Sequence, residues 1–280
     1  MRKLDVKEIE DAVRDMCIRA NLYLGEDVIG AFEKAKDVET SPVGKEILQN
    51  LIRNAEIAKN EEMPICQDTG MAVFFVEVGQ EVQLVGENIT KAIQEGVRRG
   101  YEEGYLRKSV VADPLIRKNT GDNTPAIIYY DIVLGDKVKI VFAPKGFGSE
   151  NMSKIKMLKP SDGVGGVIDF VVQTVSEAGP NPCPPIVVGV GIGGTMDKAA
   201  VLAKKALTRP VGLKNPLENL QKMEDILLEK INDLGIGPQG LGGNTTALAV
   251  NVEAFATHIA GLPVAVNINC HAARHEEIVL

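Results

Sequence analysis

Three of the four cysteines in this 280-residue chain lie where a thiol could serve as a ligand. Cys66 precedes the polar turn QDTG, Cys183 lies inside PNPCPP, and Cys270 precedes HAARH. Each is next to a predicted strand, in a segment of turn residues of the kind that usually presents ligands. Cys17 differs, because it lies among apolar residues at helical spacing and should pack as a small hydrophobic side chain. The cysteines therefore divide into one structural residue and three candidate ligands.

Three converging thiolates would suit a soft metal, and two kinds of centre are consistent with them. A structural zinc site needs a fourth ligand, which His271 or His275 could provide. A cubane iron–sulfur cluster usually has four cysteine ligands, so a cluster held by three would leave one iron open to substrate or water. An open iron acts as a Lewis acid, which is a catalytic arrangement. Three unrelated buried cysteines are the structural alternative, since cysteine is among the most buried residue types.

A glycine pattern near Cys183 suggests a nucleotide site, but the residues after it argue against one. Gly189, Gly191 and Gly194 match G-x-G-x-x-G after a predicted strand and before a predicted helix. A dinucleotide fingerprint also needs an acidic residue about 20 positions later, at the end of the next strand. The chain reads RPVGLKN there and offers neither a carboxylate nor a strand. We expect these glycines to let the backbone pass close to something beside Cys183, such as a cluster.

Two other glycine-rich segments could contribute to a site. The segment 145–151, KGFGSEN, has N–H groups that could hold a carboxylate, or it is a plain connecting loop. The segment 235–244, GIGPQGLGGN, could line a site or simply make close turns. The residue types leave both alternatives open in each segment.

A mixed α/β framework must position these candidate residues. Apolar residues at helical spacing predict three helices over 6–60, the third beginning at Pro42, which suits a first helical position. Further helices are predicted over 87–104, 163–178, 196–207 and 217–234. Strands are predicted over 71–79, 126–133, 137–142, 186–190, 246–251 and 263–269, with a hairpin over 126–142. The fold class is α+β in one domain (1–280), with a helical N-terminal region (1–60) packed on a mixed sheet in an α/β region (61–280) that carries the ligand loops.

Composition and charge argue against several classes of protein. The net charge of −7 and the absence of tryptophan are unlike a nucleic-acid-binding surface. No apolar run approaches the roughly 18 to 20 residues that cross a bilayer. The first twenty residues mix charged and apolar positions, which is unlike a secretory signal. We expect a soluble cytoplasmic protein that binds neither nucleic acid nor a membrane.

Seven short motifs, taken together, resemble those of one family. They are ICQDTG, NTGDNTPA, KGFGSEN, GPNPCPP, GVGIGGT, GLGGNTTAL and NINCHAARH. This set is similar to that of the class I iron–sulfur fumarate hydratases, specifically to the alpha subunit of the two-subunit form. The iron–sulfur tartrate dehydratase alpha subunit shares the layout. The resemblance covers roughly residues 5–277.

The resemblance implies a [4Fe–4S] cluster bound by Cys66, Cys183 and Cys270, whose fourth iron contacts the substrate. In that family a substrate-contacting glutamine and an acid directly follow the first cysteine, and here these positions are Gln67 and Asp68. Asp68 would then protonate the departing hydroxyl as a general acid. Alternatively it is a turn-forming residue, because Asp-Thr-Gly is ordinary turn chemistry.

Two further substrate contacts follow from the resemblance. The family's substrate-binding arginine falls on Arg107, where a guanidinium could form paired hydrogen bonds to a carboxylate, and Arg117 is the alternative nearby. The backbone contact of the family's glycine loop falls on Gly148.

The resemblance also implies a reaction and a partner. The reaction is the interconversion of fumarate and (S)-malate, a step of the tricarboxylic acid cycle. The base that takes the C3 proton and further basic residues belong to a beta subunit, in an α2β2 assembly, so the chain alone would bind a cluster but be nearly inactive. L(+)-tartrate dehydratase is the alternative within this class, and a zinc-stabilised binding module is the alternative from another class.

Overall fold

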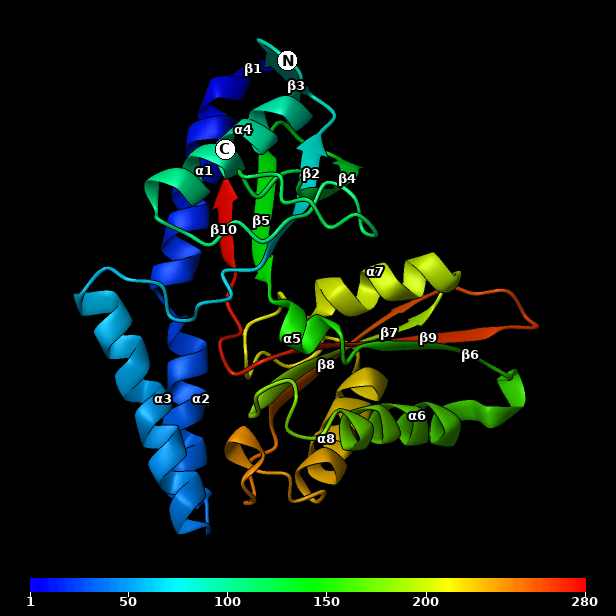
Figure 1. Cartoon of the computed structure of the whole chain (residues 1–280). Helices are drawn as coiled ribbons and strands as arrows, with labels where there is room; N and C mark the ends of the chain where they lie inside the picture. The colour runs from blue at the N-terminus through cyan, green and yellow to red at the C-terminus, as the bar shows by residue number, and fades with distance from the viewer. The chain divides into compact units, whose positions relative to one another are not determined.

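The computed structural model describes residues 1–280 and forms two compact units, each with its own main sheet (Figure 1). The first unit comprises Met1–Leu24, Ala55–Phe147 and Arg274–Leu280, and the second comprises Gly25–Asn54 and Gly148–Ala273. Both units combine helices with a mixed sheet, which confirms the predicted α+β class. None of the helices has both the length and the apolar character that a membrane-spanning segment requires.

The helices predicted from apolar spacing are present, with shifts of a few residues at their ends. The first sixty residues form α1 (Val6–Leu22), α2 (Glu26–Val38) and α3 (Pro42–Asn60), with Pro42 at the first helical position as predicted. The later helices are α4 (Ile89–Glu103), α5 (Phe147–Glu150), α6 (Gly163–Ala178), α7 (Met196–Ala206) and α8 (Glu218–Asn232), with 3₁₀ turns η1 (Pro160–Asp162) and η2 (Pro238–Gly240). Side chains of Asp5 and Asn88 cap α1 and α4 by accepting N–H groups of the first turn.

The main sheet of the first unit has the strand order β10-β5-β2-β4. β2 (Met71–Gly79) pairs antiparallel with β5 (Val138–Lys145) and parallel with β4 (Ile127–Val133). β10 (Glu276–Val279) extends the sheet beyond β5, and a separate parallel pair joins β1 (Arg2–Asp5) to β3 (Val82–Val85). The bounds of β2 are those predicted, whereas β1, β3 and β10 were not predicted.

The predicted hairpin over 126–142 is wrong, although both of its strands exist. β2 lies between β4 and β5, so these two strands are not hydrogen-bonded to each other. The connecting turn pairs instead with the end of β2, where Gln80 and Glu81 donate their N–H groups to the carbonyls of Val133 and Gly135. Residues 72–76 of β2 are all buried, whereas β4 exposes Ile132 at the edge. The more buried strand, β2, takes the interior position, and β4 lies at the edge of the sheet.

α1 packs closely on α4 in the first unit because α4 carries two glycines at the contact. A Cβ atom added at Gly96 would lie 2.6 Å from the carbonyl oxygen of Glu10, and one at Gly100 would lie 2.7 Å from Cys17 Cβ. Cys17 is fully buried in this core, and its burial raises the pKa of the thiol. The prediction that Cys17 is a hydrophobic core residue is confirmed.

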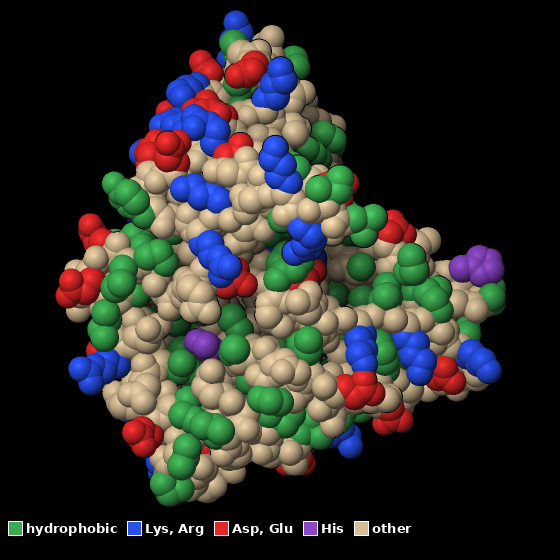
Figure 2. Space-filling view, viewed as in Figure 1, with side chains coloured by type: hydrophobic (Ala, Val, Ile, Leu, Met, Phe, Trp, Pro, Cys, Tyr) green, Lys and Arg blue, Asp and Glu red, His purple; other side chains and the backbone are tan.

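Acidic and basic side chains are mixed over α1 and α4, as the upper part of Figure 2 shows. Arg99 pairs with Glu10, Asp11 and Glu103, so one guanidinium joins the two helices. The hydrogen bond from Arg99 holds the pKa of Asp11 below its usual range. The pairs to Asp11 and Glu103, whose carboxylates are half-exposed, each contribute little to stability and add to packing that the glycines already allow.

The sheet of the second unit has the strand order β6-β9-β7-β8. β7 (Ile186–Gly193) pairs antiparallel with β9 (Leu262–Asn269) and parallel with β8 (Ala247–Phe255), and β6 (Lys154–Leu158) pairs antiparallel with β9. α7 covers one face of the sheet, while α6 and α8 cover the other (Figure 1). β6 was not predicted.

The glycines of β7 make room for α7. Val188 and Val190 belong to the core that α6 and α8 cover, so the alternate residues Gly189 and Gly191 face the opposite side of the sheet. A Cβ atom at either glycine would lie 2.1 Å from a carbonyl oxygen of α7. The close neighbour of these glycines is therefore a helix backbone, and the expectation that they pass beside a cluster is wrong.

Glu39, between α2 and α3, anchors the glycine-rich segment 235–244 in the second unit. It is 1% exposed, and its carboxylate accepts the N–H groups of Asn244 and Thr245 at 2.9 and 3.0 Å. It also accepts the N–H groups of Thr40 and Ser41. Burial alone would raise the pKa of Glu39, but hydrogen bonds from Ser41, Asn244 and Thr245 outweigh it and hold that pKa below its usual range.

Replacing Glu39 by glutamine should destabilise the fold by at least about 2 kcal/mol at neutral pH, because an amide NH₂ would face backbone N–H groups. A lowered folded-state pKa stabilises the native state above the unfolded pKa, near about 4.3, and this stabilisation disappears as the pH falls through the folded value. The difference in unfolding free energy between wild type and Glu39→Gln should therefore shrink below about pH 4. Denaturant unfolding across pH measures it. Glu46→Gln, at an exposed site on α3, is the control, and a difference that stays constant with pH would contradict the assignment.

Candidate active site

The turn after Cys66 is held by its own aspartate. Oδ1 of Asp68 accepts the N–H of Gly70 at 3.0 Å, and Oδ2 accepts the N–H of Phe147 at 2.9 Å. The N–H of Asp68 points at Cys66 Sγ, 3.4 Å away. Asp68 is thus a turn-forming residue, as one of the two interpretations of the sequence expected, and its second oxygen ties the turn to the segment that follows β5.

Two buried side chains hold the backbone of this turn from the protein side. Arg274 donates from Nη2 to the carbonyl of Asp68 at 2.6 Å, and Tyr101 donates from its hydroxyl to the carbonyls of Thr69 and Gly70. Burial raises the pKa of Tyr101 well above its ordinary value, so the phenol stays a donor. Arg274 is 6% exposed, and its Nε and Nη1 have no hydrogen-bond partner. Neither residue was predicted from the sequence to belong to the site.

The predicted substrate-binding residues of the first unit differ in their distance from this turn. Arg107 is joined to it, because its carbonyl accepts the hydroxyl of Thr69 at 3.1 Å, and its side chain is exposed. Arg117 lies in a separate turn, with a φ of 65° and its N–H bonded to the carbonyl of Asp113. Gln67 is exposed within the turn itself. The hydrogen bond from Thr69 favours Arg107 over Arg117.

The glycine segment 145–151 contacts Asp68 through a residue that was not predicted. A Cβ atom at Gly146 would lie 3.2 Å from Oδ2 of Asp68, and the next residue, Phe147, donates the N–H bond to that oxygen. Gly148, the predicted contact, belongs to the second unit, is exposed, and has no atom within 4 Å of an added Cβ. The open space at Gly148 would let a ligand approach its backbone.

In the second unit, strand pairing places Cys183 and Cys270 on neighbouring loops. Cys183 precedes β7 and Cys270 follows β9, and these strands pair with Val187 opposite Asn269. The N–H of His271 donates to the carbonyl of Cys183 at 3.2 Å and joins the two loops directly. Cys183 is exposed with a φ of 57°, an uncommon conformation for a residue with a Cβ, and Cys270 is half-buried.

Gln239 joins the same two loops from the glycine-rich segment 235–244. Its backbone N–H and its side-chain Nε2 both lie 2.7 Å from the carbonyl oxygen of Pro184. Nε2 is also 3.1 Å from Nδ1 of His271. The glycines beside Gln239 were noted in the sequence but this residue was not, because nothing local shows that its side chain reaches residues so distant along the chain.

The donor set of three accessible thiols suits a soft metal centre. As the side chains stand, no three His, Cys, Asp or Glu residues are grouped as a metal site. Cys66, Cys183 and Cys270 are each partly accessible on loops fixed by hydrogen bonds, whereas Cys17 is sealed in the core. His271 turns Nδ1 toward Gln239 and the Cys183 carbonyl, so this nitrogen is already engaged by protein groups. The accessible thiols therefore fit a centre with sulfur ligands.

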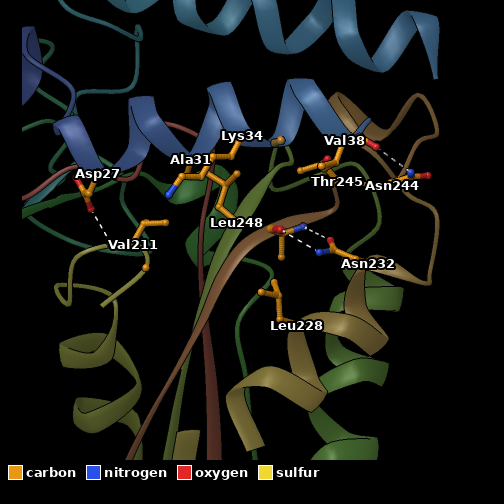
Figure 3. Close-up of a pocket in the computed structure, with 13 residues that line it drawn as sticks. Asp27, Ala31, Lys34, Val38, Val211, Leu228, Asn232, Asn244, Thr245 and Leu248 are labelled. Atoms are coloured by element: carbon orange, nitrogen blue, oxygen red, sulfur yellow. Dashed lines mark hydrogen bonds between the residues drawn. The ribbon is translucent and has the colours of Figure 1, made fainter. Parts of the chain in front are cut away.

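A pocket of about 350 Å³ in the second unit lies between α2 and the region around α8 and β8 (Figure 3). Its polar side chains serve the fold itself. Asp27 accepts the N–H of Val211, and the Asn232 amide bonds the backbone of Thr246 and Ala247. None of the predicted site residues lines this pocket.

Known proteins place the chain in a family. Residues 10–279 match the family described as fumarate hydratase (fumerase). A protein provisionally named L(+)-tartrate dehydratase subunit alpha, from Methanocaldococcus jannaschii, is 46% identical over 273 residues, which cover 95% of each chain. The L(+)-tartrate dehydratase subunit alpha of Escherichia coli strain UTI89 is 35% identical over 96% of this chain and 89% of its own. That of Shigella sonnei is 34% identical over 98% and 91%. The chain therefore belongs to the class I fumarate hydratase family, as a hydro-lyase alpha subunit.

Proposed function

We propose that this chain is the cluster-bearing alpha subunit of a hydro-lyase that interconverts fumarate and (S)-malate. The observation that carries the proposal is the turn at Cys66, where a thiol, an amide and a carboxyl occur on successive residues with their backbone fixed by hydrogen bonds. The family match over residues 10–279 supports the reaction class. The whole chain, 1–280, would act as one alpha domain.

Cys66, Cys183 and Cys270 would hold a [4Fe–4S] cluster as thiolates. When bound, the cluster would supply Lewis acidity through an iron that has no protein ligand. This would act on the C2 hydroxyl and the adjacent carboxylate of malate. Cys183 and Cys270 suit this role because the bond from the His271 N–H to the Cys183 carbonyl already joins their loops.

Asp68 would move the proton at the departing oxygen. Dehydration of malate breaks the C2–O bond and one C3–H bond, and Asp68 would donate a proton to the leaving hydroxyl so that it departs as water. In the hydration direction the same carboxylate would accept that proton. Its two bonds from Gly70 and Phe147 fix the orientation of the carboxyl group, and each oxygen keeps a further lone pair for this transfer.

The remaining predicted residues would bind the dicarboxylate. The exposed guanidinium of Arg107 would form paired hydrogen bonds to one carboxylate. Gln67 would contact the substrate through its side-chain amide, and Gly148 through its backbone, where an added Cβ would meet no atom within 4 Å. These contacts would orient C2 relative to Asp68.

A beta subunit would supply the base for the C3 proton and further basic residues, and we propose an α2β2 assembly. The tartrate dehydratase relatives are themselves named as alpha subunits, which supports a partner chain. We propose a cytoplasmic enzyme that takes part in the tricarboxylic acid cycle, with no binding to nucleic acid or membranes.

L(+)-tartrate is the second candidate substrate, because the relatives at 46% and 35% identity carry the name of tartrate dehydratase. Tartrate has one more hydroxyl than malate, and a site built to bond that hydroxyl discriminates strongly against a substrate that lacks it.

The assembled alpha and beta chains should dehydrate (S)-malate with a kcat/KM well above that for L(+)-tartrate. Absorbance of the fumarate double bond follows the first reaction, and a coupled assay for oxaloacetate follows the second. The alpha chain alone should show nearly no turnover, since the base lies elsewhere. A higher kcat/KM for tartrate would replace the proposed substrate, and full activity of the alpha chain alone would remove the proposed beta subunit.

Serine at Cys66, Cys183 or Cys270 should each abolish stable binding of iron and sulfide after anaerobic reconstitution. Cys17→Ser is the control, because Cys17 lies in the core and should lower stability rather than iron content. Iron and acid-labile sulfide analysis with the visible absorption spectrum measures the result. Stoichiometric zinc in the wild-type protein, without sulfide, would contradict the cluster.

Asp68→Asn should lower kcat about 10²- to 10⁴-fold, because an amide cannot donate the acid proton in its place. It should also destabilise the turn by about 1 to 3 kcal/mol, since its NH₂ group would face either the Gly70 or the Phe147 N–H. Asp113→Asn is the matched control, because Asp113 also accepts two N–H bonds in a turn, both at one oxygen that asparagine keeps. Activity is scaled to the folded fraction, and a kcat near that of wild type would exclude Asp68 as the acid.

A further inference from the structure

Gln239 occupies a position where one side chain contacts both cysteine-bearing loops of the second unit. With the His271 proton on Nε2, the two hydrogens of its amide serve two acceptors at once, the carbonyl oxygen of Pro184 at 2.7 Å and Nδ1 of His271 at 3.1 Å. Pro184 is the residue after Cys183, and His271 is the residue after Cys270. The amide therefore spans from one loop to the other at the residues next to both thiols.

The backbone at Gln239 is held in an uncommon conformation to make this contact. Its φ and ψ are 52° and 18°, in the left-handed region that residues with a Cβ seldom adopt. Strained residues of this kind persist only where the surrounding structure fixes them, and they gather at functional sites. The backbone N–H of Gln239 also donates to the Pro184 carbonyl, so the strain serves the contact with the Cys183 loop.

The segment that carries Gln239 is itself rigid. A Cβ atom at Gly240 would lie 2.2 Å from Cβ of Pro180, so the segment packs directly on the loop of Cys183. Within the segment, the N–H of Gly242 donates to the carbonyl of Ile236. At its far end the buried carboxylate of Glu39 accepts the N–H groups of Asn244 and Thr245. The segment that carries Gln239 is thus held in place by these contacts.

We propose that Gln239 is a positioning residue that fixes the Cys183 and Cys270 loops relative to each other and so keeps the spacing of two thiolate ligands. The proposal rests on the proposed function for the cluster, but its contacts do not involve the thiols themselves. Groups that orient metal ligands from outside typically change metal affinity about 10- to 100-fold when they are removed. A side chain that only filled space would affect overall stability alone.

The test uses Gln239→Glu and Gln239→Ala in the full chain, kept with its partner subunit where one co-purifies. Glutamate has nearly the same shape, but as a carboxylate it cannot donate to Pro184 or His271. Both variants should release iron to a chelator about 10- to 100-fold faster than wild type. Deuterium uptake in the segment 270–273, where the His271 N–H is bonded to Cys183, should also rise, by about tenfold in rate. For Gln239→Ala, exchange elsewhere and the melting temperature should stay near wild type.

Gln221→Ala on α8 is the control for loss of a glutamine in the same unit and should match wild type in both measurements. Iron release and deuterium uptake at wild-type rates in Gln239→Ala would overturn the proposal. If Gln239→Glu does not fold, Gln239→Ala decides alone, since it removes the donor without adding a charge. If the wild-type protein takes up no iron and sulfide, the proposed function fails. Deuterium uptake in 270–273 then still decides whether Gln239 joins the two loops.

Discussion

Antiparallel pairing of β7 with β9 sets where the candidate ligands of the second unit lie. Val187 pairs with Asn269 in this ladder, so the segment before β7 and the segment after β9 lie at the same end of the sheet. Cys183 and Cys270 are neighbours for this reason, although they are far apart in the sequence. A slip of one residue in β9 would move Val264 and Val266 out of the core that α6 and α8 cover. The hydrophobic pattern that stabilises the unit therefore also fixes the end of the sheet at which both thiols lie.

Loops that leave regular structure must find other partners for their backbone groups, and in this chain buried and half-buried polar side chains provide them. Asp68 and Glu39 accept N–H groups in their respective units, while Gln239 and Arg274 donate to carbonyls. Arg274 does so with Nη2 and leaves its buried Nε and Nη1 without a protein acceptor. The loops that carry the cysteines thus depend on a few long-range polar contacts as well as on apolar packing.

The local sequence pattern was sufficient to predict many of the helices and strands and to suggest which residue types could form the site. Helical spacing and the proline at residue 42 predicted the start of α3, and the apolar run MAVFFVEVG predicted β2. Pairing was not predictable in the same way, because β2 entered between β4 and β5 from earlier in the chain. The glycines of β7 were identified in the sequence, but their close neighbour was not, because α7 follows them in the chain and its packing on β7 is set only by the fold. Gln239 and Glu39 were missed for the same reason, since each bonds to a residue more than 50 positions away in the sequence.

The two interpretations of Asp68, turn former and proton donor, are compatible in this geometry. Each carboxylate oxygen has two lone pairs and uses one for a backbone N–H, so the turn bonds fix the plane of the group and leave acceptor capacity on both oxygens. A carboxyl that must transfer a proton at one defined atom gains from such fixing, because a freely rotating side chain would lose orientation on every turnover. Because Asp68 makes the hydrogen bond to Gly70 that is typical of an Asp-Thr-Gly turn, the sequence of the turn alone does not indicate a catalytic role. What distinguishes this turn is the thiol that precedes it and the donation from Phe147, which only the fold supplies.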